Sequence, residues 1–280
     1  MTPTIADKLA TDQPSDCQKG TNKDLEFQWN VSGATRLGKI RTENQDSFTI
    51  WRESVSQIFI AANDGAGGID GGREASQSAA ESALAVMEYT AGSNLSPRRR
   101  LEMAIAEARE TAKAEKLNGI TTAILTYCEN DKLHYATLGD GAVVAVWPDG
   151  MVSHIQTPHH ILGQPDNVIA AYIGQGCEIK PRTGSIRLEP GRTIMLMTDG
   201  ASELFPYDDF AHNRLAYSEA LKQKDNSDLA DHLLKQIEEA RDPETDAYLH
   251  HDNMTLVLAH ISSKDHHHTM ASVIKEKTNA

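Results

Sequence analysis

Five aspartates in this sequence stand at or beside the ends of apolar runs, usually next to a glycine or an asparagine. They are Asp46, Asp64, Asp140, Asp199 and Asp252. A small residue after a strand lets the backbone turn or approach another segment closely. Carboxylates that meet at one rim repel one another unless a cation neutralises them. Oxygen ligands without cysteine or a histidine pair favour a hard ion, so the pattern indicates Mg²⁺ or Mn²⁺ chemistry.

A second interpretation fits each of these aspartates taken alone. Asp-Gly and Asp-Asn are common turn pairs, so any one of the five could serve only to turn the chain. The repetition of the pattern at several strand ends favours a metal site. The spacing alone does not decide between the two interpretations.

The segments that must position these aspartates change their hydrophobic period along the chain. A helix is predicted from the N-cap Ser96 and Pro97 to the Asn118-Gly119 pair, and others over residues 74–87 and 227–237. Strands are predicted over residues 31–51, 56–62, 121–128, 133–138, 143–147, 151–155, 193–198 and 254–261. Several connections are too short for parallel crossovers, so we expect an α+β fold with mainly antiparallel sheet.

Composition and charge exclude several function classes. The 280 residues carry 27 Lys and Arg against 40 Asp and Glu, a net charge of −13, which disfavours nucleic acid and anionic membranes as partners. No run approaches the roughly 20 apolar residues of a membrane helix. Cys17, Cys128 and Cys177 lack metal-knuckle spacing and indicate a reducing compartment. We expect a cytoplasmic protein with a mobile polar leader at residues 1–26.

Six motifs in chain order resemble those of the metal-dependent type 2C (PPM) Ser/Thr protein phosphatases of bacterial type. The motifs are GKIRTENQDSF (38–48), IAANDGAGGIDGGREAS (60–76), GITTAILT (119–126), LGDGAVV (138–144), MLMTDGASE (195–203) and DNMTLVL (252–258). The resemblance implies a catalytic domain over residues 27–262. Its implied fold is an α-β-β-α sandwich of two stacked antiparallel sheets flanked by helices, with a two-metal site at one end.

The resemblance also implies metal ligands. Asp64 is similar to the carboxylate that bridges two metal ions, and Gly65 to a residue that adds a carbonyl ligand. Asp199 and Asp252 resemble the remaining direct ligands, and Asp46 the residue that holds metal-bound water. A third, weaker ion would be held by Asp140. The implied cofactors are therefore two Mg²⁺ or Mn²⁺ ions, with a third as an option.

The implied reaction is the hydrolysis of phosphoserine or phosphothreonine on proteins by a metal-activated water. Asp64 would act in catalysis through the metal ions, and Arg41 resembles the arginine that grips the substrate phosphate. A guanidinium suits that task because it donates two parallel hydrogen bonds to phosphate oxygens. The resemblance leads us to expect a monomeric enzyme that acts in signalling. Thr122 and Asn253 are similar to supporting residues that shape the turn and the strand.

Three positions depart from the family pattern. Ala66 stands where other members have a histidine or methionine, Gln45 replaces a common glutamate, and Gly141 stands in a GDGA motif that lacks the usual arginine. None of the three is a direct ligand, so we expect an active enzyme. Two other functions stay open: a non-catalytic pseudophosphatase that binds a regulatory partner, and a phosphoesterase for small molecules.

Several histidines could contribute to the site or could be ordinary loop residues. His159 and His160 lie in the variable loop over residues 156–178, and His250 and His251 directly precede Asp252. A third group, residues 266–268, lies in the polar tail predicted at 263–280. A solvated or structural role is the simpler interpretation for the loop pair and for the tail.

Overall fold

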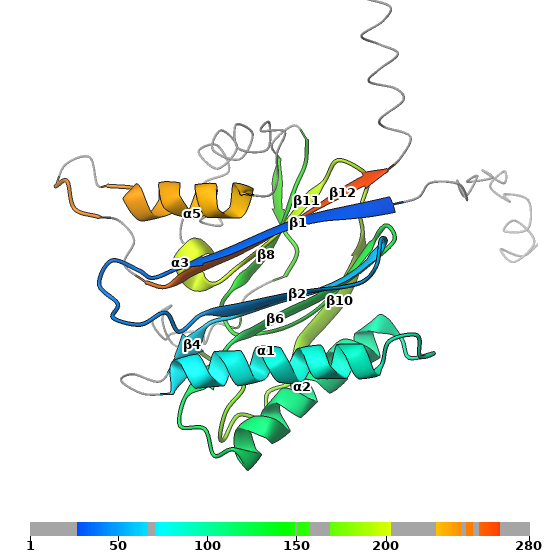
Figure 1. Cartoon of the computed structure of the whole chain (residues 1–280), viewed down its shortest axis with the longest axis horizontal. Coiled ribbons are helices and arrows are strands. Elements are labelled where there is room, and N and C mark those ends of the chain that lie inside the picture. The colour runs from blue at the N-terminus through cyan, green and yellow to red at the C-terminus, as the bar shows by residue number, and fades with distance from the viewer. Residues whose placement is uncertain are drawn as a thin grey trace, which may run out of the picture.

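The computed structural model describes residues 27–66, 71–148, 151–156, 159, 169–202, 228–241, 245–248 and 252–263. The predicted leader at residues 1–26 lies outside the described residues, as does the predicted tail apart from residue 263. Two five-stranded sheets are stacked on each other, and helices cover their outer faces (Figure 1). This arrangement confirms the predicted α-β-β-α sandwich.

The first sheet has the strand order β1-β12-β11-β8-β9, and each neighbouring pair is antiparallel. Its strands are β1 (Phe27–Arg36), β8 (Ala142–Val146), β9 (Val152–His154), β11 (Thr193–Met197) and β12 (Met254–Ser263). One helix, α5 (Leu229–Glu239), packs on its outer face through Leu229, Leu233, Leu234 and Ile237. A short helix, α3 (Asp199–Ser202), follows β11 directly.

The second sheet has the order β10-β7-β6-β3-β2 and is also antiparallel throughout. Its strands are β2 (Ser47–Ser54), β3 (Gln57–Asn63), β6 (Ala123–Glu129), β7 (Lys132–Leu138) and β10 (Arg182–Arg187). Two long helices, α1 (Gly72–Tyr89) and α2 (Pro97–Ala114), cover its outer face. A small two-stranded sheet joins β4 (Gly65–Ala66) to β5 (Ile120–Thr121).

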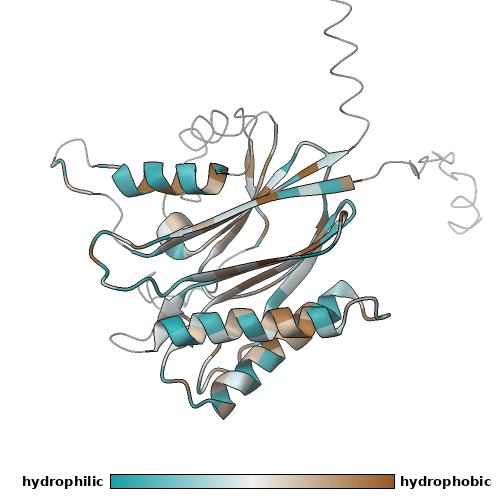
Figure 2. Cartoon of the chain, viewed as in Figure 1, coloured by the Kyte–Doolittle hydropathy of each residue, from teal (hydrophilic) through white to brown (hydrophobic). Residues whose placement is uncertain are grey.

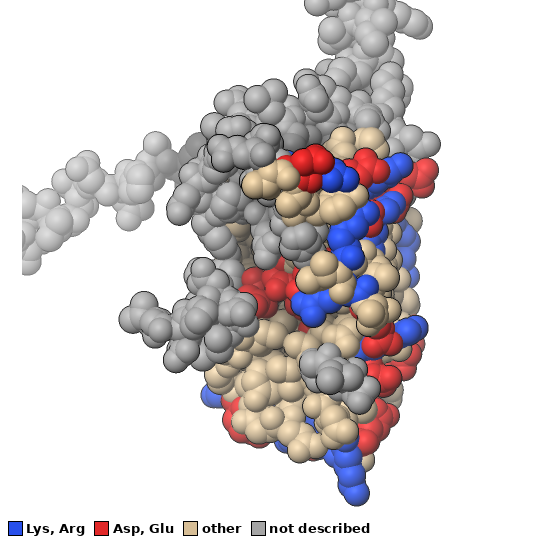
Figure 3. All heavy atoms as spheres, turned by 90° about the vertical axis from the view of Figure 1, so that its left-hand side faces the viewer, with Lys and Arg blue, Asp and Glu red and all other residues tan. Residues whose placement is uncertain are grey.

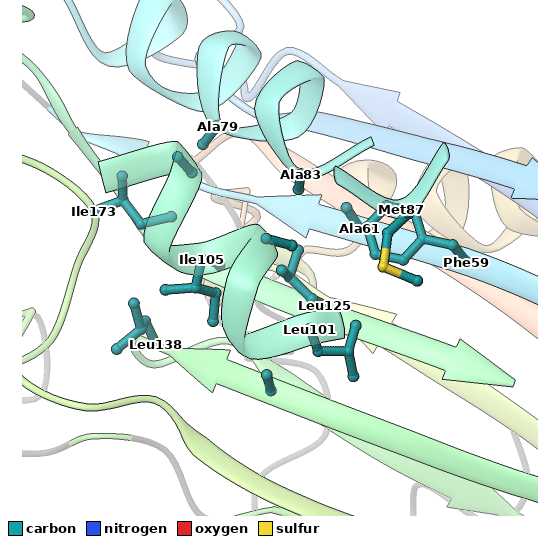
Figure 4. Packing of buried hydrophobic residues seen from close by; sticks show 14 of the residues in the cluster. Phe59, Ala61, Ala79, Ala83, Met87, Leu101, Ile105, Leu125, Leu138 and Ile173 are labelled. Carbon is teal, nitrogen blue, oxygen red and sulfur yellow. The ribbon is translucent and has the colours of Figure 1, made fainter. Parts of the chain in front are cut away.

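The continuous apolar run of β3 is explained by burial on both faces of its sheet. Ile58 and Ile60 point into the core between the two sheets, whereas Phe59 and Ala61 point toward α1 and α2. Figure 4 shows these helix-facing side chains packed against Met87 and their neighbours. The hydropathy colouring shows the same layering, with apolar residues concentrated in the strands and on the inner helix faces (Figure 2).

Two predicted features need correction. The single strand run at residues 31–51 is two strands, β1 and β2, which lie in different sheets and are joined by residues 37–46. The helix predicted up to the Asn118-Gly119 pair ends at Ala114. Its start was predicted correctly, because the Ser96 side chain accepts a hydrogen bond from the Arg99 N–H at 3.3 Å.

Cys128 and Cys177 are buried free thiols, and Cys17 lies outside the described residues. Within the described part of the chain, no helix has the length and apolar character needed to span a bilayer.

Candidate active site

The aspartates selected from the sequence lie at one end of the two sheets. In the second sheet, the first residue of β2 pairs with the last residue of β3, which places Asp46 and Asp64 at adjoining strand ends. In the first sheet, the end of β11 pairs with the start of β8 and near the start of β12, which places Asp199 beside the ends that carry Asp140 and Asp252. Figure 3 shows acidic side chains gathered in a hollow on this face, with basic side chains beside them.

Asp64 is held by two threonines, Thr121 at the end of β5 and Thr122 between β5 and β6. Its backbone N–H donates to Thr122 Oγ1 at 3.0 Å, and its carbonyl accepts from the Thr122 N–H at 2.8 Å and from Thr121 Oγ1 at 2.8 Å. The next residue, Gly65, sits so close to the carbonyl groups of Gln45 and Gly72 that a side chain there would collide with both. The backbone around Asp64 is therefore tightly fixed.

Asp46 is buried, and one of its two carboxylate oxygens has no partner. Oδ2 accepts a hydrogen bond from Thr198 Oγ1 at 2.8 Å, whereas Oδ1 is buried without one. The pKa of Asp46 is raised from 3.8 to about 7, mainly because burial disfavours the charged form. Hydrogen bonds from Thr198 and Thr255 act against this rise, and the charges of Asp199 and Asp252 add to it.

Asp64 follows a strand of the second sheet and Asp199 follows a strand of the first, and each carboxyl group influences the pKa of the other. Burial, followed by the charges of Asp199 and Asp46, raises the pKa of Asp64 well above 3.8. Burial and the charge of Asp140 raise the pKa of Asp199 to about 6. The cluster thus holds protons that isolated aspartates would release.

Arg41 reaches the cluster from the loop between β1 and β2. Its Nη2 lies 2.5 Å from Asp252 Oδ2, and the two side chains are 48% and 38% exposed. The hydrogen bond that Arg41 donates to Asp252 is the largest cause that raises the pKa of Arg41, and the charges of Asp252, Asp199 and Asp64 add to it. Arg41 therefore stands at the edge of the carboxylate cluster with part of its surface open to solvent.

Asn253 fastens this loop to the strand that carries Asp252. Its Oδ1 accepts from the Gln45 N–H at 3.0 Å, and its Nδ2 donates to the Glu43 carbonyl at 3.1 Å. This contact gives Asn253 the supporting role expected from the sequence. Thr198 and Thr255 were not singled out from the sequence, because an isolated threonine gives no signal that it will reach an aspartate 152 positions away.

The chemistry of this cluster fits a hard divalent cation. The described residues, with the side chains as placed, contain no group of three His, Cys, Asp or Glu residues gathered for metal binding. The ion pair of Arg41 with Asp252 balances part of the negative charge. The donors are all oxygens, two of the carboxyl groups have raised pKa values of about 6 and 7, and Asp46 Oδ1 is buried without a partner. A bound cation would stabilise the charged form of these carboxyl groups and could give the unpartnered oxygen of Asp46 a partner.

His159 has a structural place rather than a place among the carboxylates. It is buried, and its backbone N–H donates to the Gly139 carbonyl at 2.9 Å, with Nδ1 3.3 Å from the same oxygen. Burial lowers its pKa, so the ring is neutral at physiological pH. His160, His250 and His251 lie outside the described residues.

Comparisons with known proteins agree on one family. The family model for protein phosphatase 2C matches residues 39–239. One similar solved structure, that of the S. agalactiae serine/threonine phosphatase, is 20% identical, with a TM-score of 0.67 over 83% of this chain and 99% of that one. The Mycobacterium tuberculosis phosphatase PstP/Ppp is 19% identical, with a TM-score of 0.65 over 84% and 99%.

A third similar structure is the catalytic domain of the serine threonine protein phosphatase PstP in complex with two manganese ions. It is 19% identical, with a TM-score of 0.64 over 85% of this chain and all of that one. A search of curated proteins gave no match. Identities this low establish a shared fold, and the family match covers most of the described chain.

Proposed function

Because the chain belongs to the protein phosphatase 2C family, we propose that it hydrolyses phosphoserine and phosphothreonine on proteins with the help of bound Mg²⁺ or Mn²⁺. The observation that carries this proposal is the meeting of carboxylates from both sheets at one rim, with Arg41 at its edge. Phosphate hydrolysis needs oxygen ligands that hold metal ions and a positively charged group that binds the phosphate, and this rim offers both.

The proposed ligands are Asp64, the Gly65 carbonyl, Asp199 and Asp252, with Asp46 behind them and Asp140 for a third ion. Such ions would supply Lewis-acid chemistry, because they lower the pKa of water and neutralise charge on phosphoryl oxygens. Asp64 and Asp199 bind a cation as carboxylates, and their raised pKa values mean that each must first lose any proton it carries. Ion binding is therefore expected to release protons near neutral pH.

Arg41 is proposed to hold the phosphate of the substrate. Its ion pair with Asp252 uses one nitrogen of a guanidinium that has five N–H donors, so further donors remain for phosphate oxygens. Asn253 and the Gln45 backbone keep the loop of Arg41 in register with Asp252. This coupling of the loop to β12 would keep Arg41, which binds the phosphate, at a fixed distance from the proposed metal ligand Asp252.

The same proposal extends to the setting in which the protein works. We propose a monomer that acts on phosphoproteins in the cytoplasm as part of a signalling pathway. The net charge of −13 supports protein substrates over nucleic acids, because a polyanion would be repelled everywhere outside the cation-bearing rim.

The testing experiment measures phosphate release from a phosphothreonine peptide, a sugar phosphate and a nucleotide, each with Mn²⁺ and with a chelator. The proposal expects metal-dependent turnover of the peptide in preference to the small molecules. Preference for a sugar phosphate or nucleotide would instead indicate a small-molecule phosphoesterase. Absence of turnover together with absence of Mn²⁺ binding in calorimetry would favour a pseudophosphatase, which the departures at Ala66, Gln45 and Gly141 would then explain.

A further inference from the structure

The loop that carries Arg41 contains a tight turn from Gly38 to Arg41. The Arg41 N–H donates to the Gly38 carbonyl at 3.3 Å, which places Lys39 and Ile40 at the two central positions of the turn. The turn lies between β1 and β2, at the end of the sandwich that carries the aspartates. Whatever side chain the turn presents to solvent is therefore next to the proposed phosphate site.

The residue before Ile40 is held against α5. Lys39 Nζ lies 3.1 Å from Glu238 Oε1 and 5.0 Å from the centre of the Tyr248 ring. Glu238 also binds Arg36 Nη1 at 2.8 Å through its second oxygen. One carboxylate therefore joins the last residue of β1 and the turn to α5.

The residue after Ile40 is held by a second ion pair, that of Arg41 with Asp252. Between these two anchored neighbours, Ile40 is 70% exposed, and Leu37 nearby is 43% exposed. A single exposed apolar side chain is ordinary on a protein surface. An exposed isoleucine on a turn fixed at both sides is a preformed contact, which loses little conformational entropy when a ligand covers it.

We propose that Ile40 is a specificity-determining residue that contacts an apolar side chain next to the phosphorylated residue of the substrate. This inference rests on the proposed function, because it takes Arg41 as the residue that binds the substrate phosphate. Ile40 directly precedes Arg41, and consecutive Cα atoms are about 3.8 Å apart, so we infer that the sequence neighbours of a phosphoresidue held by Arg41 pass near Ile40.

The charges around the turn favour an apolar neighbour over an acidic one. Lys39 is paired with Glu238, and Arg36 is paired with both Glu238 and Asp231. These cations are therefore already balanced and offer little net attraction to acidic residues of a substrate. The large apolar side chains exposed on and directly before this turn are those of Ile40 and Leu37.

The experiment compares two phosphothreonine peptides that differ only in the two residues on each side of the phosphothreonine, leucine in one and serine in the other. Both are assayed with Mn²⁺ on the full chain, on Ile40→Ser and on Val55→Ser, with p-nitrophenyl phosphate as a substrate that has no flanking residues. Val55 is a matched control because it is 60% exposed and lies in the β2–β3 hairpin, at the other end of the sheet.

We expect the natural chain and Val55→Ser to prefer the leucine peptide in kcat/KM by about fivefold or more, the effect of partly burying one aliphatic contact. In Ile40→Ser the preference should fall below about twofold, with turnover of p-nitrophenyl phosphate unchanged. Turnover without a flank preference, or a preference that survives in Ile40→Ser, would overturn this inference alone. No metal-dependent turnover of any substrate would overturn the proposed function and this inference with it.

Discussion

Replacing Arg41 with glutamine is expected to have opposite effects on the two kinds of ligand. Arg41 Nη2 lies 2.5 Å from Asp252 Oδ2, and Asp252 is one of the proposed metal ligands. A cation that binds there must share or displace the guanidinium. Arg41→Gln should therefore bind Mn²⁺ more tightly and the phosphate of a substrate more weakly.

The size of the metal effect follows from the exposure of the ion pair. The side chains of Arg41 and Asp252 are 48% and 38% exposed, and exposed pairs are worth about 0.2–1 kcal/mol. Without the guanidinium of Arg41 competing for Asp252, the Kd for Mn²⁺ should fall by up to about fivefold. Losing charge-assisted hydrogen bonds to phosphate costs about 1.5–3 kcal/mol, which raises KM for a phosphopeptide by about ten- to 100-fold.

Isothermal calorimetry with Mn²⁺ alone measures the first effect, and steady-state kinetics with a phosphothreonine peptide measures the second. Arg98→Gln is the matched control, because Arg98 is an exposed arginine on α2 with one carboxylate partner, Glu102, at 2.8 Å. This variant should leave both quantities unchanged.

Two results would refute the reasoning. Weaker Mn²⁺ binding in Arg41→Gln would mean that the arginine supports the ligand arrangement instead of competing with the cation. An unchanged KM would mean that another group holds the phosphate.

Three further predictions concern the fold around the site. Folding raises the pKa of Asp46 from 3.8 to about 7 and that of Asp199 from 3.8 to about 6. The folded, metal-free protein therefore binds more protons than the unfolded chain between these values, and it should lose stability as the pH rises from 3.8 to about 7. Its Tm by calorimetry should be higher at about pH 5 than at about pH 8. Mn²⁺ should reverse the loss, and a Tm that does not fall between these pH values would contradict the assigned shifts. The buried guanidinium of Arg100 lies 2.9 Å from the carboxylate of Glu53, and Glu53→Gln removes this counter-charge. The variant should lower the free energy of unfolding, measured in urea, by about 3 kcal/mol. A loss below about 1 kcal/mol would show that the ion pair is unimportant for stability. Gly65→Ala forces a methyl group against the carbonyl groups of two neighbouring segments. The variant should bind Mn²⁺ more weakly in calorimetry and should be less stable. Mn²⁺ binding equal to that of the natural chain would show that the backbone at this position adjusts freely.

Features that depend on local chemistry could be predicted from the sequence. The start of α2 follows from one hydrogen bond of Ser96 to the next turn and from Pro97 at the first helical position. The antiparallel order follows from short connections such as the one between β6 and β7, where Glu129 pairs with Lys132. The identities of the aspartates at the rim follow from their places at or beside the ends of apolar runs.

Features that depend on distant partners could not be predicted in this way. The run at residues 31–51 looks like one strand, but its halves pair with β12 in one sheet and with β3 in the other. The strand β10 was not predicted, since it is an edge strand whose residues are exposed or half-buried and lack a clear apolar period. The partners of Asp46 and the anchoring of Lys39 by Glu238 depend on side chains brought together only by the folded chain.

The central claim is that carboxylates from both sheets bind the cations on which phosphoprotein hydrolysis depends. The most direct measurement titrates Mn²⁺ into the natural chain and into Asp64→Asn while following phosphate release from one phosphothreonine peptide. The account predicts that turnover of the natural chain rises with Mn²⁺ and returns to background with a chelator, and that Asp64→Asn folds but shows no Mn²⁺-dependent turnover. Equal turnover by Asp64→Asn, or turnover by the natural chain with chelator present, would contradict it.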